Sequence, residues 1–274
     1  MALTKAYGAG TQLAFWTQVD TRGHMTAFDA TTTAGATASG MRQFTGIKSA
    51  NPAPVEPDFP LITGDDGPIG RIDFGTAETP KWVMEVAIGD LTADAQLQGT
   101  TVHSIGDAYF NAYQPLDAVY PDIAIIYNSK AKNSPTNTKA WRSLLVPICT
   151  AVPLDRDNYQ ERTPAVFRYS ILANPAVKYP WGVTITAAIA GTEQTIGFVV
   201  QADNPIIAHR LTGDNSTTTF NLPKTPVSVA KTVVYTGNGA LATVSSVHVA
   251  NKTMTLSVAP GTGVEIQVFY EFTP

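Results

Sequence analysis

The 274-residue chain has little charge and only one cysteine. Charged residues make up 15% of the sequence, below the roughly 25% of an average soluble chain. A single cysteine, Cys149, excludes an internal disulfide and a cysteine metal cluster. Because Cys149 lies in the apolar run 144–152, we expect a buried small side chain, in a protein made in a reducing cytoplasm.

Long hydrophobic runs are also missing. No stretch approaches the ~18 consecutive apolar residues of a transmembrane helix. The N-terminal sequence MALTKAYGAGTQLAFW lacks the basic and apolar regions of a signal peptide. We therefore expect no membrane insertion by this chain.

Motifs for catalysis and cofactor binding are missing as well. The sequence has no G-x-S-x-G elbow and no phosphate-binding loop, and none of its four histidines has another ligand at metal-binding spacing. We therefore expect no enzyme activity, no metal and no cofactor. A carbohydrate-acting enzyme with a C-terminal binding module stays open as an alternative, because the two carboxylates of glycoside hydrolysis have no fixed spacing in sequence. The one dense acidic group is Asp65, Asp66, Asp73, Glu78 and Glu85.

What the chain does contain favours β-structure. Its 36 threonines and its valines suit strands, while 21 glycines and 19 prolines suit turns. In 81–88 apolar and mixed residues alternate, so Trp82 and Met84 face one side and Glu85 the other. One short helix is expected at 90–99, ended by Gly99. The other strands predicted before residue 203 are 11–19, 69–75, 101–113, 123–128, 141–152, 164–172, 183–190 and 194–201.

Two segments read as loops. Residues 20–60 contain a small, polar centre and the proline-rich NPAPVEPDFP, which predicts a long extended loop ordered by a partner. The polar, basic segment SKAKNSPTNTK at 129–139 lies between apolar runs, which predicts the tip of a long hairpin.

The pattern of predicted elements changes near residues 203–205. Five short strand-like segments follow, at 217–222, 227–236, 240–249, 253–258 and 264–272, separated by turn signals. We therefore predict two domains, 1–205 and 206–274, with the second a small Ig-like β-sandwich.

Charge is divided unevenly along the chain. Residues 54–122 carry twelve acidic and two basic residues, a net charge of −10, and 130–178 carry eight basic and three acidic residues, a net charge of +5. Two unrelated solvated surfaces would give this pattern. So would complementary faces of a subunit that stacks on copies of itself.

The order of these features resembles the tail tube, or major tail, protein of long-tailed bacteriophages. The stretch PAVFRYSILANPAVKYPWG at 164–182 is similar to the closing part of that domain. The segments LTGDNSTTTFNLPKTPVSV at 211–229 and VEIQVFYEF at 264–272 resemble an added sandwich found on some of these proteins. The resemblance implies a tail-tube-like β-sandwich with one flanking helix and 206–274 decorating its outside.

The resemblance also implies a function. Six copies would form a ring, rings would stack head-to-tail into the tube of a virion tail, and other tail proteins would bind its ends. DNA would pass through the lumen to the host without specific binding, since a neutral or acidic wall repels phosphate. A capsid decoration protein or an adhesin-like surface protein is the alternative among structural proteins, and it predicts trimers or monomers.

Two groups of residues are candidates for these roles. Arg71, Asp73 and Glu85 lie on polar faces of predicted strands in the acidic region, so we expect Asp73 and Glu85 to face the lumen with Arg71 partly neutralising them. The same polar face could equally be the outer surface. We expect Lys130, Lys132 and Lys139 to lie at contacts between rings, opposite acidic residues of 54–122.

Overall fold

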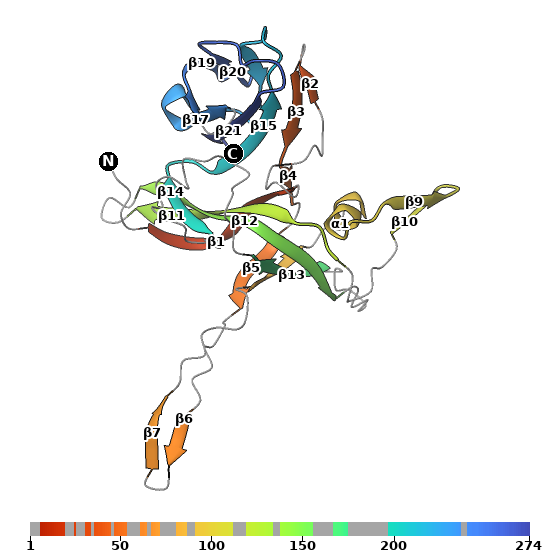
Figure 1. Ribbon diagram of the computed structural model, residues 1–274, viewed down its shortest axis with the longest axis vertical. Coiled ribbons are helices and arrows are strands. Elements are labelled where there is room, and N and C mark those ends of the chain that lie inside the picture. Colours follow the sequence, from red (N-terminus) through yellow and green to blue (C-terminus); the bar gives the residue numbers. More distant parts are fainter. Residues whose placement is uncertain are drawn as a thin grey trace.

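The protein is mainly β, with several antiparallel sheets and one short α-helix among the residues that the structure describes (Figure 1). This confirms the predicted fold class. The structure, a computed structural model, describes residues 6–19, 25, 31–33, 36–44, 47–53, 61–64, 67–71, 81–86, 91–111, 119–133, 138–155, 167–174, 197–236 and 240–274. The predicted strand at 183–190 lies outside them.

The largest sheet has eight strands, and seven of them follow the order β4-β1-β11-β12-β13-β8-β5. The eighth, β14, pairs with the first part of β12, and β13 pairs with the last part of the same strand. The strands are β1 (Ala6–Gln18), β4 (Arg42–Gln43), β5 (Ile47–Ala53), β8 (Lys81–Val86), β11 (Ile123–Asn133), β12 (Lys139–Asp155), β13 (Phe167–Ala173) and β14 (Phe198–Ala202).

This sheet must curl. Strands β4 and β5 stand at opposite ends of the strand order, yet only residues 44–46 separate them in the chain. At ~3.6 Å per residue the two edges therefore lie within about 14 Å of each other. The backbone N–H of Phe44 donates to the carbonyl of Ala14 at 2.9 Å, which extends the pairing of β4 with β1.

Strands within residues 20–60 correct one prediction. The segment was expected to be an extended loop, but it contains β4, β5, β2 (Thr31–Thr33) and β3 (Ala36–Gly40). Strand β3 pairs with β15 (Ile206–Thr212), where Ser39 lies opposite Arg210. The partner strand is remote in sequence, so the local composition did not reveal it.

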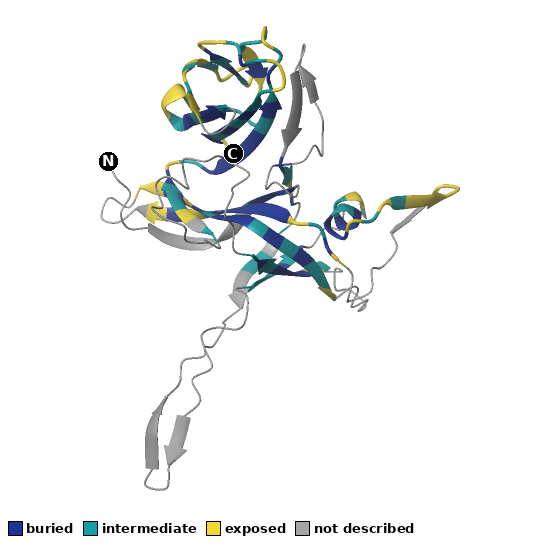
Figure 2. Cartoon of the chain, in the orientation of Figure 1, coloured by how far each residue is buried: buried dark blue, intermediate teal, exposed yellow. Residues whose placement is uncertain are grey.

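The central strands of the large sheet are buried on both faces (Figure 2). Trp16 and Ile125 point into one hydrophobic cluster, whereas their neighbours Phe15 and Ile126 point into another. Strands with two covered faces have continuous apolar sequences instead of alternating ones, as in FW and IAIIY here. Each face of the sheet therefore supports its own core.

Helix α1 (Leu91–Leu97) covers the first cluster, close to its predicted range. Leu97 is buried there, and the hydroxyl of Tyr169 donates to Asp94 at 2.9 Å in a buried contact between sheet and helix. Gly99 has φ +70°, a left-handed conformation that glycine adopts without strain, so the helix ends where the sequence predicted. The helix is short, and its packing on the sheet stabilises it.

A hairpin follows the helix in place of the single strand predicted at 101–113. Strand β9 (Val102–Ile105) pairs with β10 (Ala108–Asn111), and Gly106 turns the chain with φ +60°. A second hairpin joins β6 (Leu61–Gly64) to β7 (Gly67–Arg71). Both are two-stranded sheets that pair with no other described strand.

The C-terminal residues form a β-sandwich, as predicted. A six-stranded sheet of order β18-β17-β21-β15-β3-β2 faces a three-stranded sheet of order β16-β20-β19. The predicted strand 240–249 is divided in two at Thr243. The new strands are β16 (Thr219–Asn221), β17 (Thr232–Thr236), β18 (Ala240–Ala242), β19 (Val244–His248), β20 (Thr253–Leu256) and β21 (Glu265–Glu271), with a 3-10 turn, η1 (Val229–Lys231), before β17.

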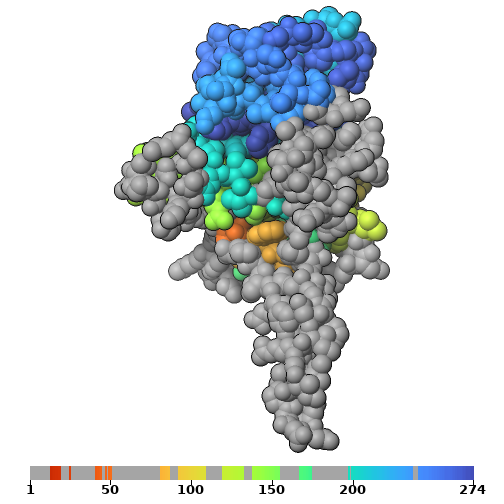
Figure 3. Space-filling model, turned by 60° about the vertical axis from the view of Figure 1, so that its left-hand side comes forward, coloured from red at the N-terminus to blue at the C-terminus, as the bar shows by residue number. Residues whose placement is uncertain are grey.

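The sandwich shares its core with the large sheet. One cluster combines Phe15 and Ile126 of the sheet with Ile207, Leu211 and Phe272 of the sandwich. The rings of Phe15 and Phe272 meet edge to face, with centroids 5.6 Å apart. Figure 3 shows the C-terminal residues as one continuous mass at one end of the molecule. The division into 1–205 and 206–274 stays a prediction, and it runs through this shared core.

Candidate functional site

The predicted hairpin at 129–139 carries its three lysines on one face. Lys132 lies opposite Lys139 across β11 and β12, and Lys130 lies two residues before Lys132. Directly paired residues share a face of a sheet, as do residues two apart on a strand. All three side chains are exposed, and none forms an ion pair within the part of the chain that the structure describes. The hairpin therefore ends in a cationic face that has no counter-charge among the described residues.

Of the three candidate lumen residues, the two that the structure describes lie in different sheets. Glu85 lies on β8 of the large sheet and forms a 2.9 Å ion pair with Arg168 of β13. Arg71 ends β7 in a different sheet, and Asp73 lies outside the described residues. Arg168 is thus the cation beside Glu85. Sequence reasoning missed this pair because the partners are 83 positions apart and meet only through strand pairing.

The faces of β8 agree with the predicted alternation. Met84 and Val86 are buried in the cluster under helix α1, while Glu85 is half-buried on the opposite face. The large sheet therefore does present Glu85 away from its core on this side. What this face meets in an assembly stays a prediction.

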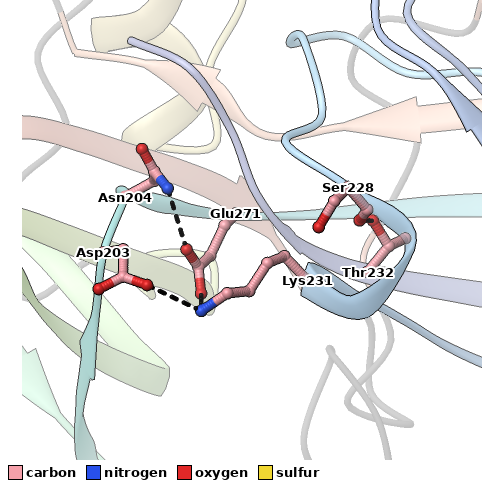
Figure 4. A network of polar contacts seen from close by, with 6 residues as sticks. All are labelled: Asp203, Asn204, Ser228, Lys231, Thr232 and Glu271. Carbon is pink, nitrogen blue, oxygen red and sulfur yellow. Dashed lines mark hydrogen bonds and ion pairs between the residues drawn. The ribbon is translucent and has the colours of Figure 1, made fainter. Parts of the chain in front are cut away.

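A polar network holds residues 203–204, which link the large sheet to the sandwich (Figure 4). The ammonium of Lys231 lies 3.2 Å from Asp203 and 3.0 Å from Glu271, and Asn204 donates to Glu271 at 3.2 Å. These contacts with Glu271 and Asp203 raise the pKa of Lys231. The bend 203–204 between β14 and β15 is therefore tied to β21 and to the turn η1.

A second polar contact of the link is fully buried. The side chain of Asn128 donates to the carbonyl of Ile206 at 3.0 Å and accepts from the N–H of Ile206 at 2.9 Å. Ser143 donates to the same Asn128 oxygen at 2.6 Å. One amide side chain thus satisfies both backbone groups of the first residue of β15, so the start of the sandwich is fixed to β11 and β12.

A groove runs between β4, the second half of β1 and the loop 222–226. It consists of two adjoining cavities of about 410 Å³ and 300 Å³, and Gln43 and Lys224 line both. Leu13, Pro223 and Pro274 form an accessible apolar wall, while Arg42 and Lys252 add positive charge. Phe15, Met41 and Ile207 also line the groove, but these residues are buried. Sequence reasoning missed this groove, since its two sides are about 180 residues apart.

Lys224 is held in place within the groove. Its ammonium donates to the side-chain oxygen of Gln43 at 3.1 Å and lies 5.7 Å from the ring centre of Phe15. Its backbone N–H donates to the Tyr270 hydroxyl at 3.1 Å, and that hydroxyl donates to the Lys224 carbonyl at 3.3 Å. An amide oxygen and an aromatic face position the cation without neutralising it.

Cys149 is buried, as predicted, and its thiol contacts the carbonyl of Ile123 at 3.4 Å. Burial raises the pKa of Cys149 well above its usual value, which favours the neutral thiol over the reactive thiolate at neutral pH. Across the described ranges, no group of three or more His, Cys, Asp or Glu residues is arranged to hold a metal ion. The helices described in the chain include none that is long and apolar enough to cross a membrane.

Comparisons of the chain with protein-family models, with curated proteins and with solved structures give no match.

Proposed function

We propose that this protein is a structural subunit that assembles with copies of itself into hexameric rings, stacked head-to-tail as the tail tube of a bacteriophage virion. DNA passes through the tube during ejection, and other tail proteins bind its ends. The subunit carries no catalytic site and no cofactor in this proposal. The support comes from two self-paired hairpins, from the cationic face at 130–139 and from the resemblance given above.

Two self-paired hairpins carry the proposal. β6–β7 and β9–β10 each have only two strands and pair with no other strand in the described part of the chain. A two-stranded hairpin by itself is marginally stable in water. The β9–β10 tip is exposed on both faces, and Ile105 is 72% accessible (Figure 2). Such elements are stabilised when a neighbouring molecule covers them, which favours an assembling subunit over a monomeric one.

The cationic hairpin supports stacking. Lys130, Lys132 and Lys139 repel one another on one face, and each gains most from an acidic partner outside its own chain. An exposed ion pair contributes only about 0–1 kcal/mol, but a ring repeats each pair six times in this proposal. The acidic region 54–122 of the next ring is the partner that its charge favours.

The test is assembly of the full chain, followed by negative-stain electron microscopy and sedimentation velocity at several salt concentrations. We expect rings or tubes at high protein concentration and low salt. Replacing Lys130, Lys132 and Lys139 together by Glu should shorten the tubes and change their salt dependence, while the free energy of unfolding changes little. Substituting three exposed residues of the sandwich, Ser245, Ser246 and Asn251, by Glu is the matched control.

The outcomes separate the alternatives. Trimers or monomers under all conditions would favour a capsid decoration or surface protein and overturn the tube. Tubes of unchanged length and salt dependence in the lysine variant would leave the tube standing and remove the lysines from the contact between rings.

A further inference from the structure

The groove around Lys224 has the composition of a site for an acidic group beside an apolar one. Lys224 lies between two cavities, with Arg42 lining the first and Lys252 the second. No aspartate or glutamate is found among the described residues that line them. Leu13 and Pro223 add accessible apolar surface next to the cations. A ligand that combines a carboxylate with a small hydrophobic group is complementary to this surface.

The tip of the β9–β10 hairpin presents that combination. Ile105 ends β9 with 72% of its surface accessible, and Asp107 follows after the turn residue Gly106. Ile105 directly precedes the two-residue turn Gly106–Asp107, so an aliphatic residue and a carboxylate lie within three positions of each other at the exposed tip of the hairpin. Figure 1 shows the hairpin extending away from helix α1 and from the large sheet.

We propose that the β9–β10 tip of one copy docks in the Lys224 groove of a second copy, with Asp107 beside Lys224 and Ile105 against the apolar wall. This inference rests on the proposed self-assembly and names one of its contacts. The groove and the tip are different surfaces, so the contact is heterologous. Contacts of this kind close into a ring or continue as a filament, and they do not stop at a dimer.

The cavities have room for the tip. A turn of two or three residues with one aliphatic side chain fits the combined space of about 410 Å³ and 300 Å³, which lies in the size range of ordinary ligand sites. The loop that presents Lys224 is rigid on its inner side, because Tyr270 binds both backbone groups of Lys224. The backbone of Lys224 is therefore already positioned before docking, so little conformational entropy of this loop is lost when the carboxylate binds.

Disulfide trapping between two variants of the full chain tests the contact. One variant carries Ala108→Cys beside the hairpin tip, and the other carries Thr225→Cys in the second cavity. The two are mixed at high concentration and oxidised, and the crosslinked peptides are identified by mass spectrometry. Ser246→Cys, an exposed position that lines neither cavity, replaces Thr225→Cys in the control. The native thiol of Cys149 is buried in every variant.

We expect the 108–225 crosslink to form roughly tenfold faster than the 108–246 control, as a charged interface contact of ordinary strength would give. Lys224→Glu in the Thr225→Cys chain should remove this advantage, and adding Asp107→Lys to the hairpin chain should restore it. Equal rates for both crosslinks, or a 108–225 rate unaffected by Lys224→Glu, would overturn the docking proposal. Thermal unfolding of each variant checks that it is folded.

The crosslinking result and the formation of tubes test different proposals. Rings or tubes in electron microscopy without the 108–225 crosslink would refute the docking and keep the proposed function. The crosslink with short chains of copies but no ring would support the docking and refute the ring.

Discussion

Strands β11 and β9 both belong to antiparallel sheets, yet their surroundings are opposite. Residues 123–128 of β11 are all buried, with both faces in a hydrophobic cluster. Residues 103–105 of β9 are all exposed. Burial of apolar area stabilises a strand by roughly 25 cal/mol per Å², and hydrogen bonding to one partner strand adds little. The body of the protein is therefore stable within one chain, and its hairpins depend on other contacts.

The strongest test of this contrast is removal of the sandwich. A chain that ends at residue 203 loses Ile207, Leu211 and Phe272 and exposes the Phe15 and Ile126 face of the large sheet. Each large side chain contributes about 1.5–3 kcal/mol when buried, and a whole domain is stable by only about 5–15 kcal/mol. We therefore expect the truncated chain to aggregate, measured by size-exclusion chromatography and circular dichroism.

A matched truncation sharpens the comparison. Shortening the β9–β10 hairpin by replacing residues 103–108 with Asn-Gly should leave the melting temperature almost unchanged, because these residues are exposed. If the 1–203 fragment of the first test is soluble and folded, the prediction of aggregation is wrong and the two predicted domains are independent.

Replacing one isoleucine in the body and one in the hairpin should give the next largest difference in the free energy of unfolding. Ile126→Ala removes a fully buried side chain and should lower the free energy of unfolding by about 2–5 kcal/mol. Ile105→Ala removes an exposed one and should change it by less than about 0.5 kcal/mol in the monomer. Urea unfolding of both variants measures the difference, and similar losses would contradict the contrast between body and hairpin.

The buried amide of Asn128 gives a smaller effect. Asn128→Ala leaves the N–H and carbonyl of Ile206 and the hydroxyl of Ser143 without this partner. Unsatisfied buried polar groups cost about 1–3 kcal/mol each, so we expect a loss of about 3 kcal/mol in urea unfolding. Asn251→Ala, in an exposed turn, is the control and should be nearly neutral. Equal effects would show that the link between sheet and sandwich does not depend on Asn128.

The last expected effect, which is absent at neutral pH, is a dependence of stability on alkaline pH. Burial raises the pKa of Cys149 and of Tyr127 well above their ordinary values of 9.0 and 10.0. Above about pH 9 the unfolded chain therefore loses protons that the folded chain retains, so stability is constant below that pH and falls as pH rises. Each group contributes a slope of about 1.4 kcal/mol per pH unit. Urea midpoints measured from pH 8 to 11 should show this fall, and Tyr127→Phe should reduce it above pH 10.

Sequence patterns predicted strands better than their partners. The alternation in 81–88 correctly placed Met84 and Val86 inside and Glu85 outside, because period-two burial is a local property. The run at 123–128 predicted a strand, but it could not show that Ile125 and Ile126 belong to different clusters. The threonine- and alanine-rich residues 31–40 look unstructured alone, and they form strands because β15 pairs with them.

The candidate sites show the same difference between local patterns, which the sequence reveals, and long-range contacts, which it does not. The lysines at 130–139 were predicted as a group because they are neighbours in the chain, and hairpin pairing places them on one face. Arg168 beside Glu85 and Gln43 beside Lys224 could not be predicted, because each pair meets only after distant strands have packed. The turn at Gly106–Asp107 did have a local signal, a Gly-Asp step between two strand-like runs.

The pairing of β3 with β15 determines when the protein can finish folding. Ser39 leaves the ribosome about 170 residues before its partner Arg210. At ~5–20 residues per second, roughly 10–35 s pass before the two strands can meet. During that interval β2 and β3 have no sheet to join, and the Phe15 face of β1 has no sandwich to cover it. Synthesis of this chain therefore includes a waiting period in which the apolar Phe15 face of β1 is uncovered and can contact neighbouring copies.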